Sequence, residues 1–132
     1  MEENIMAAIQ RILVPVDGSV SSAKAAEEAL FYADKCGAEL HLLYVASEIQ
    51  KDIPSSIIFD EISKNVPAGV IVQTHETAGN IADEILRTAD DFAVSMIIMG
   101  SRGLGIFKGA LIGSVSQQVV ERSKVPVMIV KA

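Results

Sequence analysis

The sequence predicts an α/β fold built on a parallel sheet with helices on both faces. Five apolar runs rich in β-branched residues alternate along the 132 residues with segments of helical periodicity. The first, fourth and fifth runs are almost continuously hydrophobic, which is typical of strands covered on both faces. Because parallel strands are joined by right-handed crossovers, a β-α order of this kind places helices on both sides of one open, Rossmann-like sheet.

The five expected strands cover residues 11–16, 39–45, 70–76, 95–99 and 125–130. The second run alternates in side-chain character, and the third becomes polar toward its end at Gln73 and Thr74. We therefore expect these two strands to be less buried than the others and to lie together on one side of the sheet.

Helical spacing appears between the strands. The first stripe consists of Ala25, Ala26, Ala29, Leu30 and Ala33. Ser19, Ser21 or Ser22 can cap this helix, and Gly37 can end it. The second stripe consists of Ile81, Ile85, Ala89 and Phe92, with Asn80 or Thr77 as its cap. A short helix is expected within residues 52–66, bracketed by Pro54 and Pro67, and a last one over residues 114–123.

Composition narrows the class of protein. A length of 132 residues fits one domain over residues 1–132, and a formal net charge of -6 argues against a nucleic-acid partner, which would call for clustered Lys and Arg. Cys36 is the single cysteine, so the chain has no intramolecular disulfide. The acidic start and the lack of a run of about 20 apolar residues predict a cytoplasmic protein without a membrane partner.

Candidate ligand-binding residues lie where strands end, because open parallel sheets bind ligands beyond the carboxyl ends of their strands. Asp17 follows the first strand, and five glycines follow the fourth between Gly100 and Ser114. Glycine lets backbone amides approach an anion closely, and a helix beginning at Gly113 adds unpaired amides. A triphosphate is therefore a fitting ligand, with the hydroxyls of Ser114 and Ser116 as further donors and Arg102 or Lys108 as a counter-charge.

The same residues also fit purely structural roles. A glycine-rich loop also serves as a mobile connector, Ser114 as a plain helix cap, Asp17 as a turn residue and Met99 as core. The chain lacks the G-x-x-x-x-G-K-[ST] motif, and its glycines only approximate a dinucleotide fingerprint. We interpret His41 and His75 as structural, because no further metal ligands cluster with them in the sequence.

The glycine spacing carries a resemblance to a known family. Gly100-x-x-Gly103, nine further residues and then Gly113-Ser114 match the G-x2-G-x9-G-[ST] pattern of the ATP-binding branch of the universal stress protein family. The opening segment from Ile12 to Ser19 and the closing segment from Val125 to Val130 are similar to the first and last strands of that family. The resemblance spans the whole chain.

This resemblance implies a sheet in the order 3-2-1-4-5 with ATP in a crevice between strands one and four. It implies that Asp17 contacts the ribose or adenine side and that three residues line the adenine pocket, namely Pro15, Val16 and Val45. It places eight residues around the ribose and phosphates: Met99, Gly100, Arg102, Gly103, Gly113, Ser114, Val115 and Ser116. Residues 46–69 form a shorter stretch than in many members, so a lid contact seen elsewhere in the family is in doubt here.

Three functions from different classes follow from these observations: an ATP-binding regulator of the stress response, a slow ATPase, and a scaffold of the same fold without nucleotide. We favour binding over turnover, because the glycine segment carries no carboxylate that would act as a base. Mg²⁺ is expected as a companion of the phosphates, and no residue is assigned a catalytic role. The resemblance also implies a homodimer through the last strand, Val125 to Val130.

Overall fold

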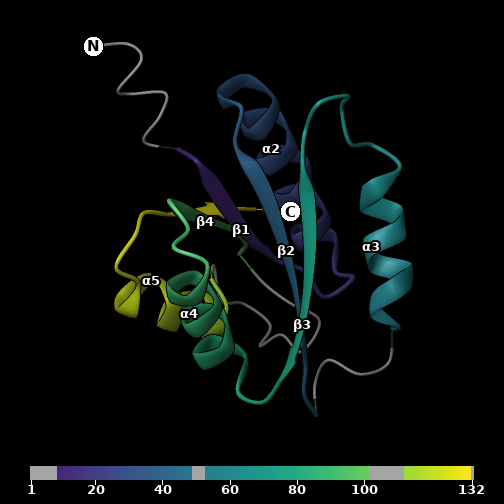
Figure 1. Ribbon diagram of the computed structural model, residues 1–132. Helices are drawn as coiled ribbons and strands as arrows, with labels where there is room; N and C mark the ends of the chain where they lie inside the picture. Colours follow the sequence, from purple (N-terminus) through teal and green to yellow (C-terminus); the bar gives the residue numbers. More distant parts are fainter. Residues whose placement is uncertain (1–8, 49–52, 102–111, 132) are drawn as a thin grey trace.

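Five parallel strands form one sheet in the order β3-β2-β1-β4-β5 (Figure 1). The computed structural model describes residues 9–48, 53–101 and 112–131. The strands are β1 (Arg11–Pro15), β2 (Glu39–Ala46), β3 (Val72–Ala78), β4 (Met96–Gly100) and β5 (Val127–Val130). The helices are α2 (Val20–Cys36), α3 (Ser55–Ser63), α4 (Ile81–Asp91) and α5 (Ser114–Arg122). The predicted fold class and the strand order implied by the family resemblance are confirmed.

Two apolar layers hold the sheet between its helices. α2 and α3 cover one face, and α4 and α5 lie side by side on the other (Figure 1). Along β1 the side chains alternate between these layers, since Ile12 and Val14 pack toward α2 while Leu13 packs toward α4. None of the described helices combines the length and the apolar character needed to cross a membrane.

Helix ends follow the capping residues that the sequence predicts. The Ser19 hydroxyl accepts a hydrogen bond from the Ser22 amide at 3.2 Å, and Asn80 Oδ1 accepts one from the Asp83 amide at 3.0 Å. Gly37 ends α2 in the left-handed region with φ at 72°, where a side chain would be strained. α5 differs, because Gly113 at its N-cap provides no side-chain acceptor.

The expectation that β2 is less buried than the first, fourth and fifth strands is wrong. All six interior residues of β2 are buried, because β1 and β3 flank the strand and helices cover both of its faces. β3 does have the predicted lower burial, and as an edge strand it consists of exposed and half-buried residues. It also starts and ends two residues later than predicted, at Val72 and Ala78, because its pairing with β2 runs from Leu40 through Ala46.

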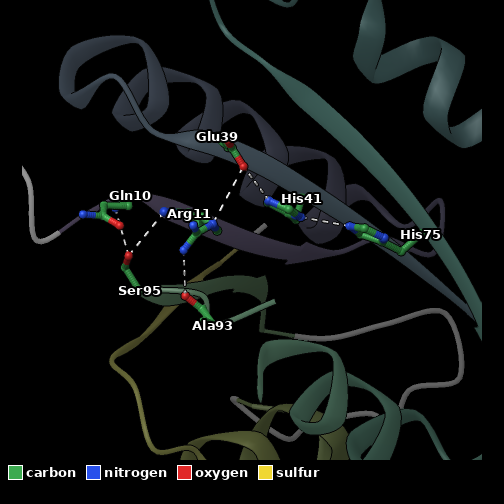
Figure 2. Close-up of polar contacts among 7 residues, drawn as sticks. All are labelled: Gln10, Arg11, Glu39, His41, His75, Ala93 and Ser95. Carbon is green, nitrogen blue, oxygen red and sulfur yellow. Dashed lines mark hydrogen bonds and ion pairs between the residues drawn. The ribbon is translucent and has the colours of Figure 1, made fainter. Parts of the chain in front are cut away.

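Polar side chains form a chain across the face of the sheet that α4 covers, in the halves of β1 and β2 that begin the strands. His41 is 2% exposed, and its Nε2 lies 3.1 Å from Glu39 Oε1. Its Nδ1 lies 2.9 Å from His75 Nε2 on β3. The two ring planes differ by 7°, and the rings meet at these two nitrogen atoms (Figure 2). Arg11 Nε lies 3.9 Å from the same Glu39 oxygen. Both histidines therefore have a structural role, tying β3 to β2.

Because of the contact between His41 and His75, we expect the free energy of unfolding to fall in mild acid. Burial, and secondarily the neighbouring His41, lower the pKa of His75 from its ordinary 6.5. Since the folded chain favours neutral His75, this contribution to stability is full above pH 6.5 and is lost as the pH falls through the lowered pKa. Urea unfolding between pH 7.5 and 5 measures the loss.

A His75→Gln variant is the matched control for this acid sensitivity. Its amide can still hydrogen-bond to His41 Nδ1, yet it does not titrate. We expect its free energy of unfolding to fall less steeply with pH than that of the wild-type chain. Parallel pH profiles for the two chains would show that His75 is not the titrating group.

Candidate functional site

β1 and β4 stop pairing before their carboxyl ends, and we call the region between them beyond their last pair the opening. β1 and β4 are in register only where Ile12 faces Met96 and Leu13 faces Ile97. The neighbouring ladders continue further: β1 stays paired with β2 up to Pro15, and β4 stays paired with β5 up to Gly100. The two central strands therefore separate before they end, at the position where crossovers leave toward opposite faces of the sheet.

Pro15 gives a physical reason for this separation. The Arg11 carbonyl accepts from Ser95 at the start of β4, whereas the Val16 amide donates to Leu43 on β2. Because backbone groups alternate along a strand, the nitrogen of Pro15 faces β4. Proline has no N–H to donate there, so the β1–β4 ladder cannot continue.

The first turn of α5 closes one side of this opening. Gln117 is the first residue of the turn whose amide finds an acceptor in the helix, donating to the Gly113 carbonyl at 2.9 Å. The amides of Ser114, Val115 and Ser116 thus have no acceptor within α5, and the positive end of the helix dipole adds to their attraction for an anion. The Gly113 amide itself donates to the Ser101 carbonyl at 2.7 Å, which fixes the start of α5 against the end of β4.

Ser116 anchors α5 from inside the protein. Its hydroxyl is buried and points its single proton at the carbonyls of Gly100, at 2.9 Å, and Ser101, at 3.2 Å. The Gly100 carbonyl faces β1, so this hydroxyl satisfies a group that the interrupted ladder leaves unpaired. The Ser116 side chain therefore serves the backbone, and what remains for a ligand at this residue is its amide.

Asp17 lies at the opposite side of the opening, just after β1. It is 6% exposed, and its Oδ1 accepts a hydrogen bond from the Ser19 amide at 2.9 Å. This is the turn-forming role that the sequence left open for Asp17. A carboxylate has about four acceptor positions, so the same group can also accept from a ligand hydroxyl.

Three of the predicted pocket residues come together on the face of the sheet that α4 and α5 cover. Val45 and Met99 belong to the apolar layer of that face, and the alternation of β1 places Pro15 on it as well. Val16 packs on the α2 face instead. Val16, Val45 and Met99 are all buried, so a role as pocket walls stays a prediction. Arg102, Gly103 and Lys108 lie outside the described residues.

Gly100 is required by packing, a reason that differs from the one expected. A Cβ at this position would lie 2.4 Å from Ser21 Oγ, 2.7 Å from the Ser21 carbonyl carbon and 2.8 Å from the Ser22 nitrogen. The first turn of α2 thus rests directly on the end of β4. Close approach to a phosphate was the reason that the sequence suggested, whereas in the structure the absent side chain of Gly100 makes room for α2.

The sequence also missed Ser22 as part of the site. Its hydroxyl accepts from the Asp17 amide at 3.3 Å and donates to the Ser19 carbonyl at 3.2 Å. The only signal was the run Ser19-Val20-Ser21-Ser22, in which small polar residues are more frequent than a single cap requires. The sequence does not show which of these serines holds Asp17, because that depends on the geometry of the turn.

Comparison with known proteins agrees with the fold and with the family that the sequence resembles. The model of the universal stress protein family matches residues 8–61 and 46–131. This chain belongs to the universal stress protein family. It is 34% identical over 145 aligned positions to universal stress protein YxiE of Bacillus subtilis, with 92% of this chain and 98% of the relative covered.

Two solved structures of similar proteins extend the comparison. Protein MJ0577 of Methanocaldococcus jannaschii has a TM-score of 0.79 at 27% identity and covers 95% of this chain and 97% of its own. A universal stress protein solved in complex with cAMP has a TM-score of 0.76 at 28% identity and covers 93% of this chain and 97% of its own. The fold of the family therefore accommodates an adenine nucleotide in at least one of these relatives.

Proposed function

We propose that this universal stress protein binds ATP in the opening between β1 and β4 and acts as a regulator whose bound state alters its contacts. The observation that carries the proposal is the early end of the β1–β4 ladder beside the uncapped first turn of α5. The triphosphate lies against the amides of Ser114, Val115 and Ser116 in this proposal, near Gly113. The adenosine part lies toward Asp17 and the ends of β1 and β2, near Pro15, Val16 and Val45.

Mg²⁺ accompanies the phosphates in this proposal. Within residues 9–48, 53–101 and 112–131, no group of three His, Cys, Asp or Glu side chains is placed to hold a metal ion. Mg²⁺ usually keeps several waters and binds through substrate phosphates with few protein ligands, so it does not need such a group. It would supply charge neutralisation while the chain's amides hold the nucleotide.

Calorimetric titration of the protein with ATP and Mg²⁺ tests the proposal, with Ser114→Ala as the first variant. The exposed Ser114 hydroxyl stands at the start of α5, and losing one charge-assisted hydrogen bond there costs about 1.5–3 kcal/mol, roughly a ten- to hundredfold loss of affinity. Ser63→Ala on α3 removes another exposed hydroxyl, on the opposite face, and serves as the control. Equal ATP affinity in all three proteins would remove Ser114 from the site.

The last strand is proposed as the seam of a homodimer. β5 pairs with β4 along one edge, and its four residues are all only half-buried. An apolar edge strand of this kind pairs readily with another chain, and a seam between two identical strands closes at two copies. Light scattering at micromolar concentration should give about twice the 14.1 kDa of one chain.

A charge at Ile129 should separate this dimer into monomers. Ile71→Glu is the control, since Ile71 is 58% exposed next to β3 at the opposite edge of the sheet. We expect Ile129→Glu to give the monomer mass and Ile71→Glu to keep the dimer mass, with circular dichroism showing that both variants fold. A wild-type monomer would refute the dimer, and a dimeric Ile129→Glu variant would place the seam elsewhere.

A further inference from the structure

The first turn of α2 connects the two sides of the opening. Four hydrogen bonds form a closed network between the end of β1 and this turn. The Ser19 amide donates to Asp17 Oδ1, and the Asp17 amide donates to Ser22 Oγ. Ser22 Oγ donates to the Ser19 carbonyl, and the Ser22 amide donates to Ser19 Oγ. Asp17, Ser19 and Ser22 are each less than 10% exposed. In this low-dielectric position the bonds hold a single arrangement of the loop.

Ser22 is the member of this hydrogen-bonded network that contacts Asp17 and Ser19 and also lies against the end of β4. Its hydroxyl both accepts from Asp17 and donates to Ser19, so it uses its donor and one acceptor position on the loop. Its backbone nitrogen lies where a Cβ on Gly100 would come within 2.8 Å. Contact with the end of β4 therefore sets the position of the first turn of α2. The Ser22 hydroxyl on that turn then holds the Asp17 amide in place.

We infer that Ser22 is a positioning residue of the nucleotide site, holding Asp17 at the angle from which its carboxylate accepts hydrogen bonds from the adenosine part of the ligand. This inference rests on the proposed ATP site. Ser22 itself does not touch the nucleotide, because its hydroxyl donates its proton to the Ser19 carbonyl and accepts from the Asp17 amide. The role of Ser22 is separate from that of α5, which approaches the phosphates from the other side of the opening.

Replacing Ser22 by alanine removes the hydroxyl that accepts from the buried Asp17 amide. The loop must then shift to replace this hydrogen bond, and Asp17 moves with it. We expect Ser22→Ala to weaken ATP binding by roughly tenfold, which corresponds to one hydrogen bond to a charged group. Ser22→Thr keeps the hydroxyl and should retain most of the affinity.

A double-mutant cycle separates positioning from a general loss of stability. The dissociation constant for ATP is measured by calorimetry for the wild-type chain and for Ser22→Ala, Asp17→Ala and the double variant. If Ser22 acts through Asp17, Ser22→Ala should change the affinity less than about twofold once Asp17 is alanine, because interacting residues are not additive. Ser22→Ala combined with Ser114→Ala should instead multiply the two single effects, since Ser114 lies at the phosphate end.

The possible results of this cycle are distinct. The positioning role is overturned if Ser22→Ala binds ATP as tightly as the wild type. It is also overturned if the Ser22→Ala substitution weakens binding by the same factor when Asp17 is alanine. Both results leave the proposed function intact. A wild-type chain that binds no ATP overturns the proposed function, and the role of Ser22 falls with it. Urea unfolding of each variant shows that the chains compared are folded.

Discussion

A Gly113→Val variant should lose ATP binding by more than about a hundredfold and still fold. Gly113 has φ at -73° and ψ at 163°, an extended conformation that valine adopts without strain. We expect the added side chain to obstruct the approach of a phosphate to the amides of Ser114, Val115 and Ser116. Losing two or more charge-assisted hydrogen bonds of about 1.5–3 kcal/mol each accounts for an effect of this size.

The control for this variant is Gln118→Val on the exposed face of the same helix. It places the same side chain on α5 without obstructing the first turn, so its ATP affinity should match that of the wild-type chain. Calorimetry on both variants, with circular dichroism to confirm that they fold, decides the matter. A folded Gly113→Val chain with wild-type affinity would exclude the start of α5 as the phosphate site.

The second large effect is expected at Gly100, and it concerns stability. An alanine there would place its Cβ within 2.8 Å of two backbone atoms of α2, a distance at which the helix or the strand must move. Overpacking of this kind costs about 1–3 kcal/mol, and more where backbone rather than a side chain must shift. The free energy of unfolding in urea should fall by at least that amount.

A compensating variant identifies which atoms oppose the new methyl group. Ser21→Gly removes the nearest atom, the Ser21 hydroxyl oxygen, but leaves the Ser21 carbonyl carbon and the Ser22 nitrogen in place. We expect the Gly100→Ala, Ser21→Gly pair to remain destabilised. Full recovery would show that only the side chain opposed the alanine, and an unchanged stability in Gly100→Ala alone would refute the packing role.

Much of the fold could be predicted because its signals are local. Apolar runs, Ser19 and Asn80 as helix caps, and Gly37 as a helix end each depend on residues a few positions apart. The burial of β2 could not be read in the same way. His41 looks unsuited to a buried strand until the register with β3 brings His75 to its Nδ1, and that register is a tertiary property.

The candidate site was predicted in outline by its glycines, its Asp17 and the ends of β1 and β4. The reasons behind individual residues were not, because they depend on contacts between distant segments. Gly100 meets a helix that begins 80 positions earlier, and Ser116 directs its hydroxyl to β4 rather than to a ligand. Pro15 shapes the opening only because its nitrogen faces β4, an orientation that the alternation of the observed ladder determines.

The most direct test of the ATP site is a titration of the isotopically labelled protein with ATP and Mg²⁺, followed by amide resonances in two-dimensional NMR. We expect saturable shifts that are largest at the amides of Gly113, Ser114, Val115 and Ser116 and at Asp17, with little change at Arg11 and Glu39, where β1 and β2 begin. Saturable shifts centred away from the β1–β4 opening, or none at millimolar ATP, would contradict the proposed site.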